Sequence, residues 1–109
     1  MTIAKQQEAV STNRNVVSIR GRINIDNSGE MRRTLSNALR SKPAELRVDL
    51  SLVTYIDISG LATLVEAARI AREQGTRMVL AGIKGQALYL FEITRLDQVF
   101  DIDRREAGS

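Results

Sequence analysis

The chain has 109 residues, of which 43% are hydrophobic and 27% charged, and its formal net charge is +3. This size and composition indicate one globular domain with a single hydrophobic core, and they exclude a disordered chain. The sequence contains no cysteine and no histidine, which excludes disulfides, zinc–thiolate sites and histidine-based acid–base catalysis.

The placement of charged and apolar residues limits the kinds of partner. Basic side chains are scattered and interleaved with acidic ones, and only two Phe and two Tyr could stack on bases, so we expect no direct contact with nucleic acid. The longest apolar stretch, residues 61–71, contains Glu66 and Arg69 and is too short to cross a bilayer. Residues 1–10 lack the apolar segment of a secretory signal. We therefore expect a cytoplasmic protein without membrane insertion.

The first part of the chain predicts two strands. Residues 7–11 and 16–19 have the composition of strands, and the polar residues 12–15 form the turn between them. Residues 21–26 are then expected to form a loop. These features predict a hairpin at the start of the domain.

A helix follows this loop. We expect Asn27 to cap it, because Glu30 stands three residues later and can bond back to the backbone amide of the cap. The only proline, Pro43, marks its end. The apolar residues with helical spacing share one face: Met31, Leu35, Ala38 and Leu39.

The rest of the chain alternates strands and helices. The expected elements are a strand at 46–50, a loop at 51–58, a helix at 60–74, a strand at 77–81, a loop at 82–85, a helix at 86–94 and a strand at 99–102. The helix at 60–74 should bury Leu61, Leu64, Val65 and Ala68 and pair Arg69 with Glu66 and Glu73. Gly75 should end it in a left-handed conformation. The helix at 86–94 should bury Leu88, Leu90 and Phe91.

The order of these elements, β-β-α-β-α-β-α-β, predicts the fold class. Strands that alternate with helices imply a parallel sheet, and the hairpin adds an antiparallel edge strand. We therefore expect a single α/β domain over residues 1–109, with a mixed, mostly parallel sheet of four to five strands and three main helices. Residues 1–6 and 103–109 are expected to be loose tails.

The most informative stretch is residues 48–64, VDLSLVTYIDISGLATL. The turn Asp57-Ile58-Ser59-Gly60 leads from a strand region into an amphipathic helix, so Ser59 should lie at a helix N-terminus whose free N–H groups can accept a phosphate. Gly60 should leave the hydroxyl open to a large partner. The structural alternative is that Ser59 is only the helix cap and Asp57 only an Asx-turn residue.

This stretch resembles the signature of STAS domains, especially those of bacterial anti-sigma factor antagonists, which is roughly D-L-S-x-V-x-(F/Y)-(I/M)-D-(S/T)-S-G-L. The positions that match it are Asp49, Leu50, Ser51, Val53, Tyr55, Ile56, Asp57, Ser59, Gly60 and Leu61. Residues 21–35 and 88–100 are similar to the first helix and the last helix and strand of that family. The resemblance covers about nine tenths of the chain.

The resemblance implies that Ser59 is a phosphoacceptor. The implied partner is a GHKL-type serine kinase that is also the anti-sigma factor, which the unmodified domain binds and so frees the sigma factor. Phosphorylation with Mg-ATP breaks that complex, and a phosphatase resets the cycle. The expected partner-binding residues are Asn24, Asp57, Ile58, Ser59, Gly60, Leu61 and Thr63. A weak pairing with a second copy of the domain is a further expected interaction.

Two other functions fit the same fold. The domain can be the STAS subunit of a membrane transport system that binds a transporter ATPase without phosphate turnover, or a scaffold of a sensory complex. Asn24 stands where many antagonists carry an acidic residue and favours these alternatives, whereas the intact Asp57-Ile58-Ser59-Gly60 favours an antagonist. We expect no enzyme activity, catalytic residue, metal or cofactor, because the sequence has no paired acids or phosphate-cradling glycine loop.

Overall fold

The computed structural model describes residues 2–3 and 15–103. The elements are β1 (Thr2–Ile3), β2 (Val16–Ile23), α2 (Ser28–Arg40), β3 (Glu45–Ile56), α3 (Ile58–Gln74), β4 (Arg77–Ala81), α4 (Gly85–Ile93), the 3-10 helix η2 (Leu96–Gln98) and β5 (Asp101–Asp103). The sheet has the order β1-β2-β3-β4-β5, with β1 antiparallel to β2 and the other neighbours parallel. The predicted fold class and element order are confirmed.

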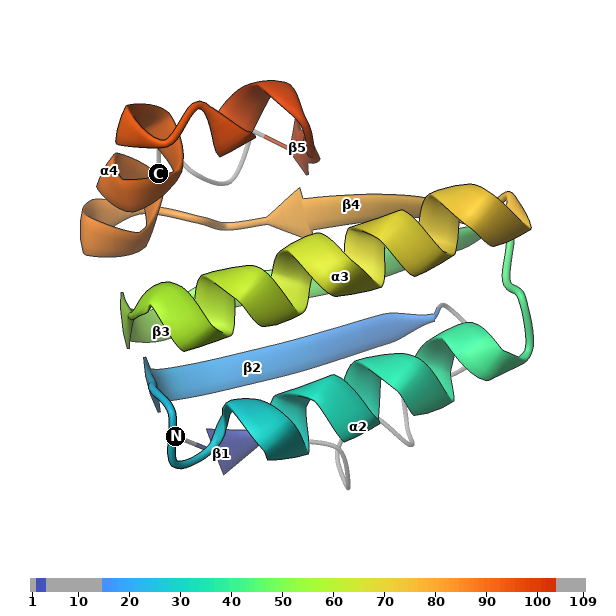
Figure 1. Ribbon diagram of the computed structural model, residues 1–109, viewed down its shortest axis with the longest axis horizontal. Helices are drawn as coiled ribbons and strands as arrows, with labels where there is room; N and C mark the ends of the chain where they lie inside the picture. The colour runs from blue at the N-terminus through green and yellow to red at the C-terminus, as the bar shows by residue number, and fades with distance from the viewer. Residues whose placement is uncertain (1, 4–14, 104–109) are drawn as a thin grey trace.

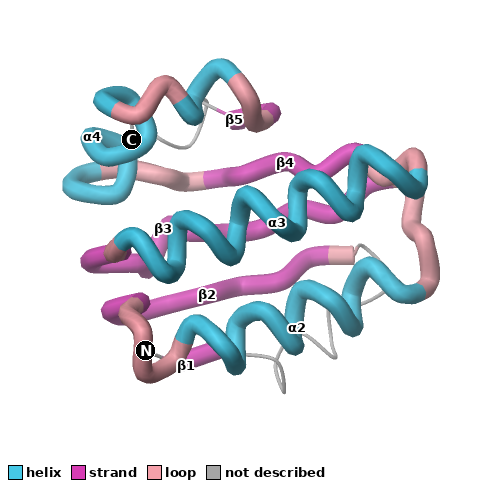
Figure 2. The backbone as a smooth tube through the Cα atoms, viewed as in Figure 1, coloured by secondary structure: helices cyan, strands magenta, loops and turns pink. Residues whose placement is uncertain are grey.

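The helices α2 and α3 lie side by side across one face of the sheet (Figure 1). The tube view shows the connections after β2, β3 and β4 at the same edge of the sheet, at the left of the picture (Figure 2). Helices α2, α3 and α4 begin there, at the carboxyl ends of the parallel strands. This edge is where ligands and partners of open α/β sheets usually bind. None of the described helices combines the length and apolar content that a bilayer crossing requires.

The core lies between this face of the sheet and the helices. Leu46, Val48 and Leu50 of β3 are buried, as their alternation predicts. The expected face of α2 is also confirmed, with Met31, Leu35 and Leu39 buried and Ala38 packed against the core. In α4, Phe91 and Ala87 are buried, while Leu88 and Leu90 are partly buried against the core.

The ion pairs and the C-terminal glycine predicted for α3 are confirmed, but one of its predicted core residues is not. Arg69 Nη1 lies 2.9 Å from Glu73 Oε2, and its Nη2 lies 3.9 Å from Glu66 Oε2, as expected. Gly75 adopts a left-handed φ of 83° at the helix end. The placement of Val65 in the core was wrong, because it is 38% exposed. The buried side of α3 instead includes Leu64, Ala67 and Ala71, so Val65 lies at its edge.

The strands β2 and β3 are longer than predicted. The expected loops at 21–26 and 51–58 are strand up to Ile23 and Ile56, which pair with each other. The parallel register between β2 and β3 shifts twice, between Ser18 and Arg20 and between Gly21 and Arg22. Such irregularities break the alternation of buried and exposed residues, which is why the sequence pattern predicted loops.

The predicted cap of α2 is correct in position but not in chemistry. Asn27 is the residue before the helix, but its side chain makes no cap hydrogen bond. It turns back instead, accepting from the backbone N–H of Asn24 at 2.9 Å and donating to the carbonyl of Arg22 at 2.9 Å. The expected capping box with Glu30 is therefore replaced by bonds within the β2–α2 loop. The helix ends at Arg40, before Pro43, as expected.

The two ends of the sheet also differ from the expectation. The strand expected at 7–11 lies outside the described residues, and the antiparallel neighbour of β2 is formed by Thr2–Ile3. The last strand is Asp101–Asp103 rather than 99–102, because residues 96–98 form η2 and Phe100 packs in the core. The ring centroids of Phe100 and Phe91 are 5.3 Å apart. Both stretches expected to be loose tails thus contribute residues to the sheet.

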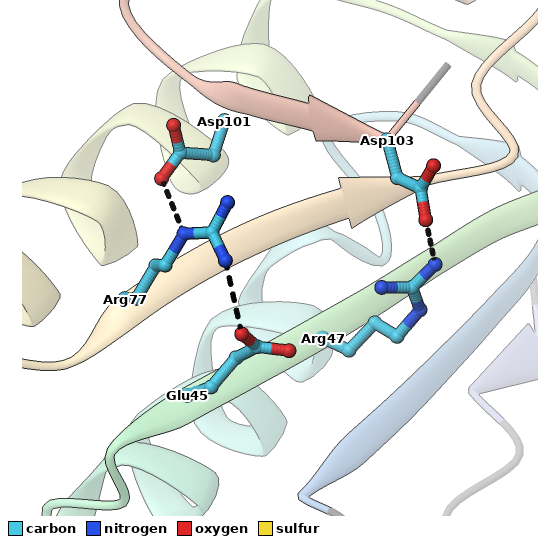
Figure 3. Close-up of polar contacts among 5 residues, drawn as sticks. All are labelled: Glu45, Arg47, Arg77, Asp101 and Asp103. Carbon is cyan, nitrogen blue, oxygen red and sulfur yellow. Dashed lines mark hydrogen bonds and ion pairs between the residues drawn. The ribbon is translucent and has the colours of Figure 1, made fainter. Parts of the chain in front are cut away.

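The face of the sheet turned away from α2 and α3 carries charged side chains from β3, β4 and β5 (Figure 3). Arg77 lies 3.3 Å from Glu45 Oε1 and 3.1 Å from Asp101 Oδ2, and Arg47 pairs with Asp103. The pairs of Arg77 are exposed and contribute little to stability. They nevertheless join β3, β4 and β5. They thereby help to hold β5, a strand of only three residues, at the end of the sheet.

Candidate functional site

The candidate site lies where β3 ends and α3 begins. β3 ends at Ile56 and α3 starts at Ile58, two residues earlier than predicted. The residue between them, Asp57, has extended backbone angles and is the helix cap. Ser59 is therefore the second residue of the helix, and the alternative in which Ser59 caps the helix is wrong. A carboxylate at this position is stabilised by the helix dipole as well as by its hydrogen bonds.

Asp57 holds this turn through one carboxylate oxygen. Its Oδ1 accepts hydrogen bonds from the backbone N–H of Ser59 at 2.9 Å, from the backbone N–H of Gly60 at 3.2 Å and from the hydroxyl of Ser59 at 2.6 Å. The N–H of Leu61 bonds to the backbone carbonyl of Asp57 at 3.0 Å. The N–H groups of Ser59 and Gly60, which were expected to be free, are therefore already bonded to Asp57.

These contacts change the acidity of Asp57. The hydrogen bond from the Ser59 hydroxyl lowers the pKa of Asp57, and backbone hydrogen bonds from Gly60, Ser59 and Ile25 act in the same direction, while desolvation opposes them. All these donors favour the charged carboxylate. Asp57 is thus an anion at neutral pH, directly bonded to the candidate phosphoacceptor.

Ser59 itself is half-buried and is not sealed in the core. Since a carboxylate can only accept, the Ser59 hydroxyl must donate its proton to Asp57. The carbonyl of Ser59 accepts the hydroxyl of Thr63 at 2.9 Å, one turn further along α3. Ser59 therefore has a fixed backbone and a hydroxyl in a defined orientation.

The remaining expected partner-binding residues of α3 lie mostly below the surface. Gly60 is buried, and a Cβ atom there would lie 2.6 Å from Ile23 Cγ2 and 2.7 Å from Ile56 Cγ1. Glycine is therefore needed at this position so that α3 can approach β2 and β3. The expectation that Gly60 leaves the Ser59 hydroxyl open to a partner was wrong, because Gly60 is buried. Leu61 and Thr63 are also buried. These three residues shape the site from within.

The β2–α2 loop forms the second wall of the site. The backbone N–H of Asp57 donates to the carbonyl of Ile23 at 3.1 Å, at the end of β2. The backbone N–H of Ile25, in the same loop, helps to lower the pKa of Asp57. Asn24 is half-buried and organises this loop, since its Oδ1 accepts from the N–H of Asp26 at 2.9 Å. Asp57 therefore ties the loop that contains Asn24 to the turn that contains Ser59.

Two exposed apolar side chains flank this junction. Ile58 is 66% exposed beside Ser59, and Ile25 is 74% exposed in the β2–α2 loop. Ile58 was expected at this surface from the sequence, whereas Ile25 was not. An isolated β-branched apolar residue in a polar loop was the available signal. Exposed apolar side chains beside a polar site are typical of protein-binding surfaces.

An apolar groove continues from Ile58 along the outside of α3. It is shallow and open, with a volume of about 480 Å³. Its lining residues are Ile58, Leu61, Ala62, Val65, Glu66, Arg69 and Leu96. Val65, which the sequence pattern placed in the core, thus belongs to a surface that begins next to Ser59.

Comparison with known proteins decides the family. The family model described as "Mlab, STAS domain" matches residues 7–102. The chain belongs to the STAS domain family. This STAS domain is 30% identical over 92 residues to the anti-sigma-B factor antagonist of Bacillus subtilis (strain 168), a match that covers 84% of each chain.

Solved structures agree with this assignment. An anti-sigma factor antagonist from Mycobacterium paratuberculosis has a TM-score of 0.68 and 26% identity, covering 80% of this STAS domain and 74% of that chain. The anti-sigma factor antagonist SpoIIAA in its unphosphorylated form has a TM-score of 0.63 and 13% identity, covering 81% and 76%. The second similarity shows the fold alone. The resemblance identified from the Asp49–Leu61 region is therefore confirmed as STAS membership.

Proposed function

We propose that this STAS domain is an anti-sigma factor antagonist that is switched off by phosphorylation of Ser59. The observation that carries the proposal is the half-buried Ser59 hydroxyl, bonded to Asp57 and flanked by the exposed Ile58 and Ile25. The named function of the Bacillus subtilis relative supports the general role. The geometry of the site supports Ser59 as its point of control.

In this proposal the partner is an anti-sigma factor that is also a GHKL-type serine kinase. Its surface covers Ser59 and contacts Ile58 and Ile25, and its bound Mg-ATP donates the phosphoryl group. A partner that must both bind and modify the domain needs an apolar contact close to an accessible hydroxyl. The junction of the two loops offers both within a few residues. A phosphatase restores the unmodified hydroxyl.

The phosphate weakens binding for two physical reasons. It adds about −1.5 to −2 charges, which must be desolvated when a partner surface closes over the site. The backbone N–H groups of Ser59 and Gly60 already bond to Asp57, so the new charge meets an occupied helix terminus and a neighbouring carboxylate. A loss of about 3 kcal/mol of binding free energy corresponds to roughly a hundredfold weaker complex.

The experiment that tests this proposal is phosphosite mapping. The purified chain is incubated with Mg-ATP and, in turn, with GHKL-type serine kinases from its own genome and with the anti-sigma-B factor of Bacillus subtilis. Intact mass spectrometry should show one added phosphoryl group, and peptide mapping should place it on Ser59. Ser59→Ala should abolish the modification, whereas the matched control Ser51→Ala should not.

Two results would contradict the proposal. The first is a phosphate on another residue with Ser59 unmodified. The second is a stable complex with a partner ATPase that never modifies Ser59, which would instead support the transport-subunit function. In both cases the STAS fold assignment would stand, because it rests on the family match and the topology.

A further inference from the structure

The face of the sheet turned away from α2 and α3 is open along the ends of β2 and β3. In β2 the buried residues Val17, Ile19 and Ile23 belong to the core, and the exposed Arg20 and Arg22 alternate with them. Because successive side chains of a strand point to opposite faces, the two arginines lie on the face opposite α2 and α3. Sheets of parallel strands are usually covered on both faces. An exposed stretch of β2 and β3 is therefore a candidate contact surface for another molecule.

Two irregularities of β3 bring its side chains to the same face as these arginines. Each register shift between β2 and β3 adds one residue to β3, so that Arg20 pairs with Leu52 and Arg22 with Tyr55. Leu52 is exposed, and the Arg22 guanidinium lies over the Tyr55 ring, 4.5 Å from its centroid. Arg20, Arg22, Leu52 and Tyr55 together form the β2–β3 patch.

The positive charge of this patch is not balanced. Within residues 2–3 and 15–103, neither arginine of the patch forms an ion pair. Further along the same face, Arg47 and Arg77 are each paired with carboxylates (Figure 3). The next acidic residue of β3 towards the patch, Asp49, bonds through Oδ1 to the N–H of Ser51 at 2.9 Å. The patch thus combines two unpaired positive charges with an exposed apolar side chain.

We propose that the β2–β3 patch is a docking surface for an acidic segment of a second protein. Carboxylates of that segment pair with Arg20 and Arg22, and one of its apolar side chains packs on Leu52. Arginine and tyrosine are typical of the residues that carry the binding energy of protein interfaces. The stacking of Arg22 on Tyr55 also limits the freedom that this arginine loses on binding. Ser59 lies in α3 on the other face of the sheet, so the domain can bind this protein and the partner at Ser59 together.

Three other occupants fit these residues less well. A second copy seated patch against patch would bring like charges together, which opposes binding. Single-stranded nucleic acid needs rings on which its bases can stack, and the Arg22 guanidinium already stacks on the Tyr55 ring. Two arginines are also too few for an anionic membrane, for which clusters of about 4–8 basic residues are typical.

The test uses the full chain labelled with nitrogen-15 and two short peptides, one that repeats Glu-Glu-Leu and a neutral control that repeats Gln-Gln-Leu. NMR titration gives both the affinity and the residues whose amide signals move. The variants are Arg20→Glu and Arg22→Glu, with Arg72→Glu as the matched control. Arg72 is also an exposed arginine without an ion pair in the described part of the chain, but it lies in the last turn of α3. Circular dichroism and urea denaturation check that each variant is folded.

We expect the acidic peptide to move the amide signals of the β2–β3 patch and the neutral peptide to leave them unchanged. Arg20→Glu and Arg22→Glu should each weaken binding at least about fivefold, because each replaces an attraction by a repulsion. Leu52→Ala should weaken it about threefold, and Arg72→Glu should stay within about twofold, since salt screens distant exposed charges. If a charge reversal lowers stability, Arg20→Gln and Arg22→Gln replace it, with an expected loss of about threefold.

Three results would overturn this inference. The first is that the acidic peptide does not bind at about 1 mM, or binds no better than the neutral one. The second is that the signals move outside the patch, or that Arg72→Glu weakens binding equally, which indicates an effect of net charge alone. The third is that the patch binds a thymidine oligonucleotide, phosphatidylglycerol vesicles or a second copy more tightly than the acidic peptide. Ser59→Ala should bind the peptide like the wild type, so these outcomes are independent of the proposed function.

Discussion

Two segments of this chain share a local sequence and a local hydrogen bond but lie in different surroundings. Asp49-Leu50-Ser51 lies inside β3, and Asp57-Ile58-Ser59 crosses from β3 into α3. In both, the serine N–H donates to the aspartate Oδ1 at 2.9 Å. The middle residue is 2% exposed in the first segment, Leu50, and 66% exposed in the second, Ile58.

The difference shows what turns a common turn into a site. In the strand the Asp–Ser turn accompanies an irregular register between β2 and β3 and buries an apolar residue in the core. At the end of the strand the same turn starts a helix, directs the serine hydroxyl to the aspartate and leaves the apolar residue outside. The candidate switch depends on the position of the segment at the carboxyl ends of the strands, and not on its local amino-acid sequence alone.

The largest expected effect concerns the two middle residues. Leu50→Ala should lower the free energy of unfolding by about 2–5 kcal/mol, because it removes methyl groups from a closed core. Ile58→Ala should change it by less than about 0.5 kcal/mol, because exposed side chains contribute little. Urea denaturation of both proteins measures this contrast. Similar losses for both would show that the two segments are equally structural.

The next effect concerns Gly60. Gly60→Ala should cost about 1–3 kcal/mol of stability, since the new methyl group would lie under 3 Å from Ile23 and Ile56. Gly29, in the first turn of α2, is the control: a Cβ there has its nearest atom at 3.9 Å, so Gly29→Ala should be neutral or stabilising. A Gly60→Ala protein as stable as the wild type would mean that α3 does not approach the strands this closely.

Substitution of the exposed residues beside Ser59 should weaken partner binding and leave stability unchanged, unlike substitution of core residues. Ile58→Ala and Ile25→Ala should each weaken the complex by about 1–2 kcal/mol, or roughly five- to thirtyfold, because each removes an apolar contact next to Ser59. Their unfolding curves should match that of the wild type. Leu52→Ala is the matched control, since Leu52 is also an exposed apolar residue but lies within β3. Calorimetric titration with the partner kinase provides the affinities, and equal affinities for all the variants would remove this surface from the interface.

The smallest expected effect is a shift in acid stability. The Ser59 hydroxyl lowers the pKa of Asp57 below the ordinary value of 3.8. A carboxyl with a lowered pKa in the folded state stabilises the protein above its unfolded pKa, and this contribution disappears as the pH falls through the folded pKa. Ser59→Ala should therefore raise the pKa of Asp57 and reduce the loss of stability below about pH 4. Carbon-13 NMR titration of the carboxyl resonance checks this, and an unchanged pKa would contradict the hydrogen bond.

Much of the architecture could be predicted because buried residues repeat with the period of their element. The face of α2 and the strand Arg77–Ala81 came from this signal. The second half of β3 and the end of β2 did not, because their register shifts interrupt the alternation. β5 was misplaced because Phe100 is buried through tertiary contact with Phe91, which no local pattern records.

The site was predicted in part. Ser59 and Asp57 followed from the resemblance to STAS domains, but their relation did not, since either residue could have capped the helix. Ile25 was missed because a single exposed residue has no periodicity. The role of Gly60 was misjudged because the close approach of α3 to Ile23 and Ile56 is a tertiary contact.

The most direct test of the central claim is the affinity of one partner for two forms of this chain. The unmodified domain and the domain phosphorylated on Ser59 are titrated with the same anti-sigma factor kinase by calorimetry, without ATP so that no phosphate is added. The phosphorylated form is expected to bind about a hundredfold more weakly, with an unchanged circular dichroism spectrum. Equal affinity of the two forms would contradict it.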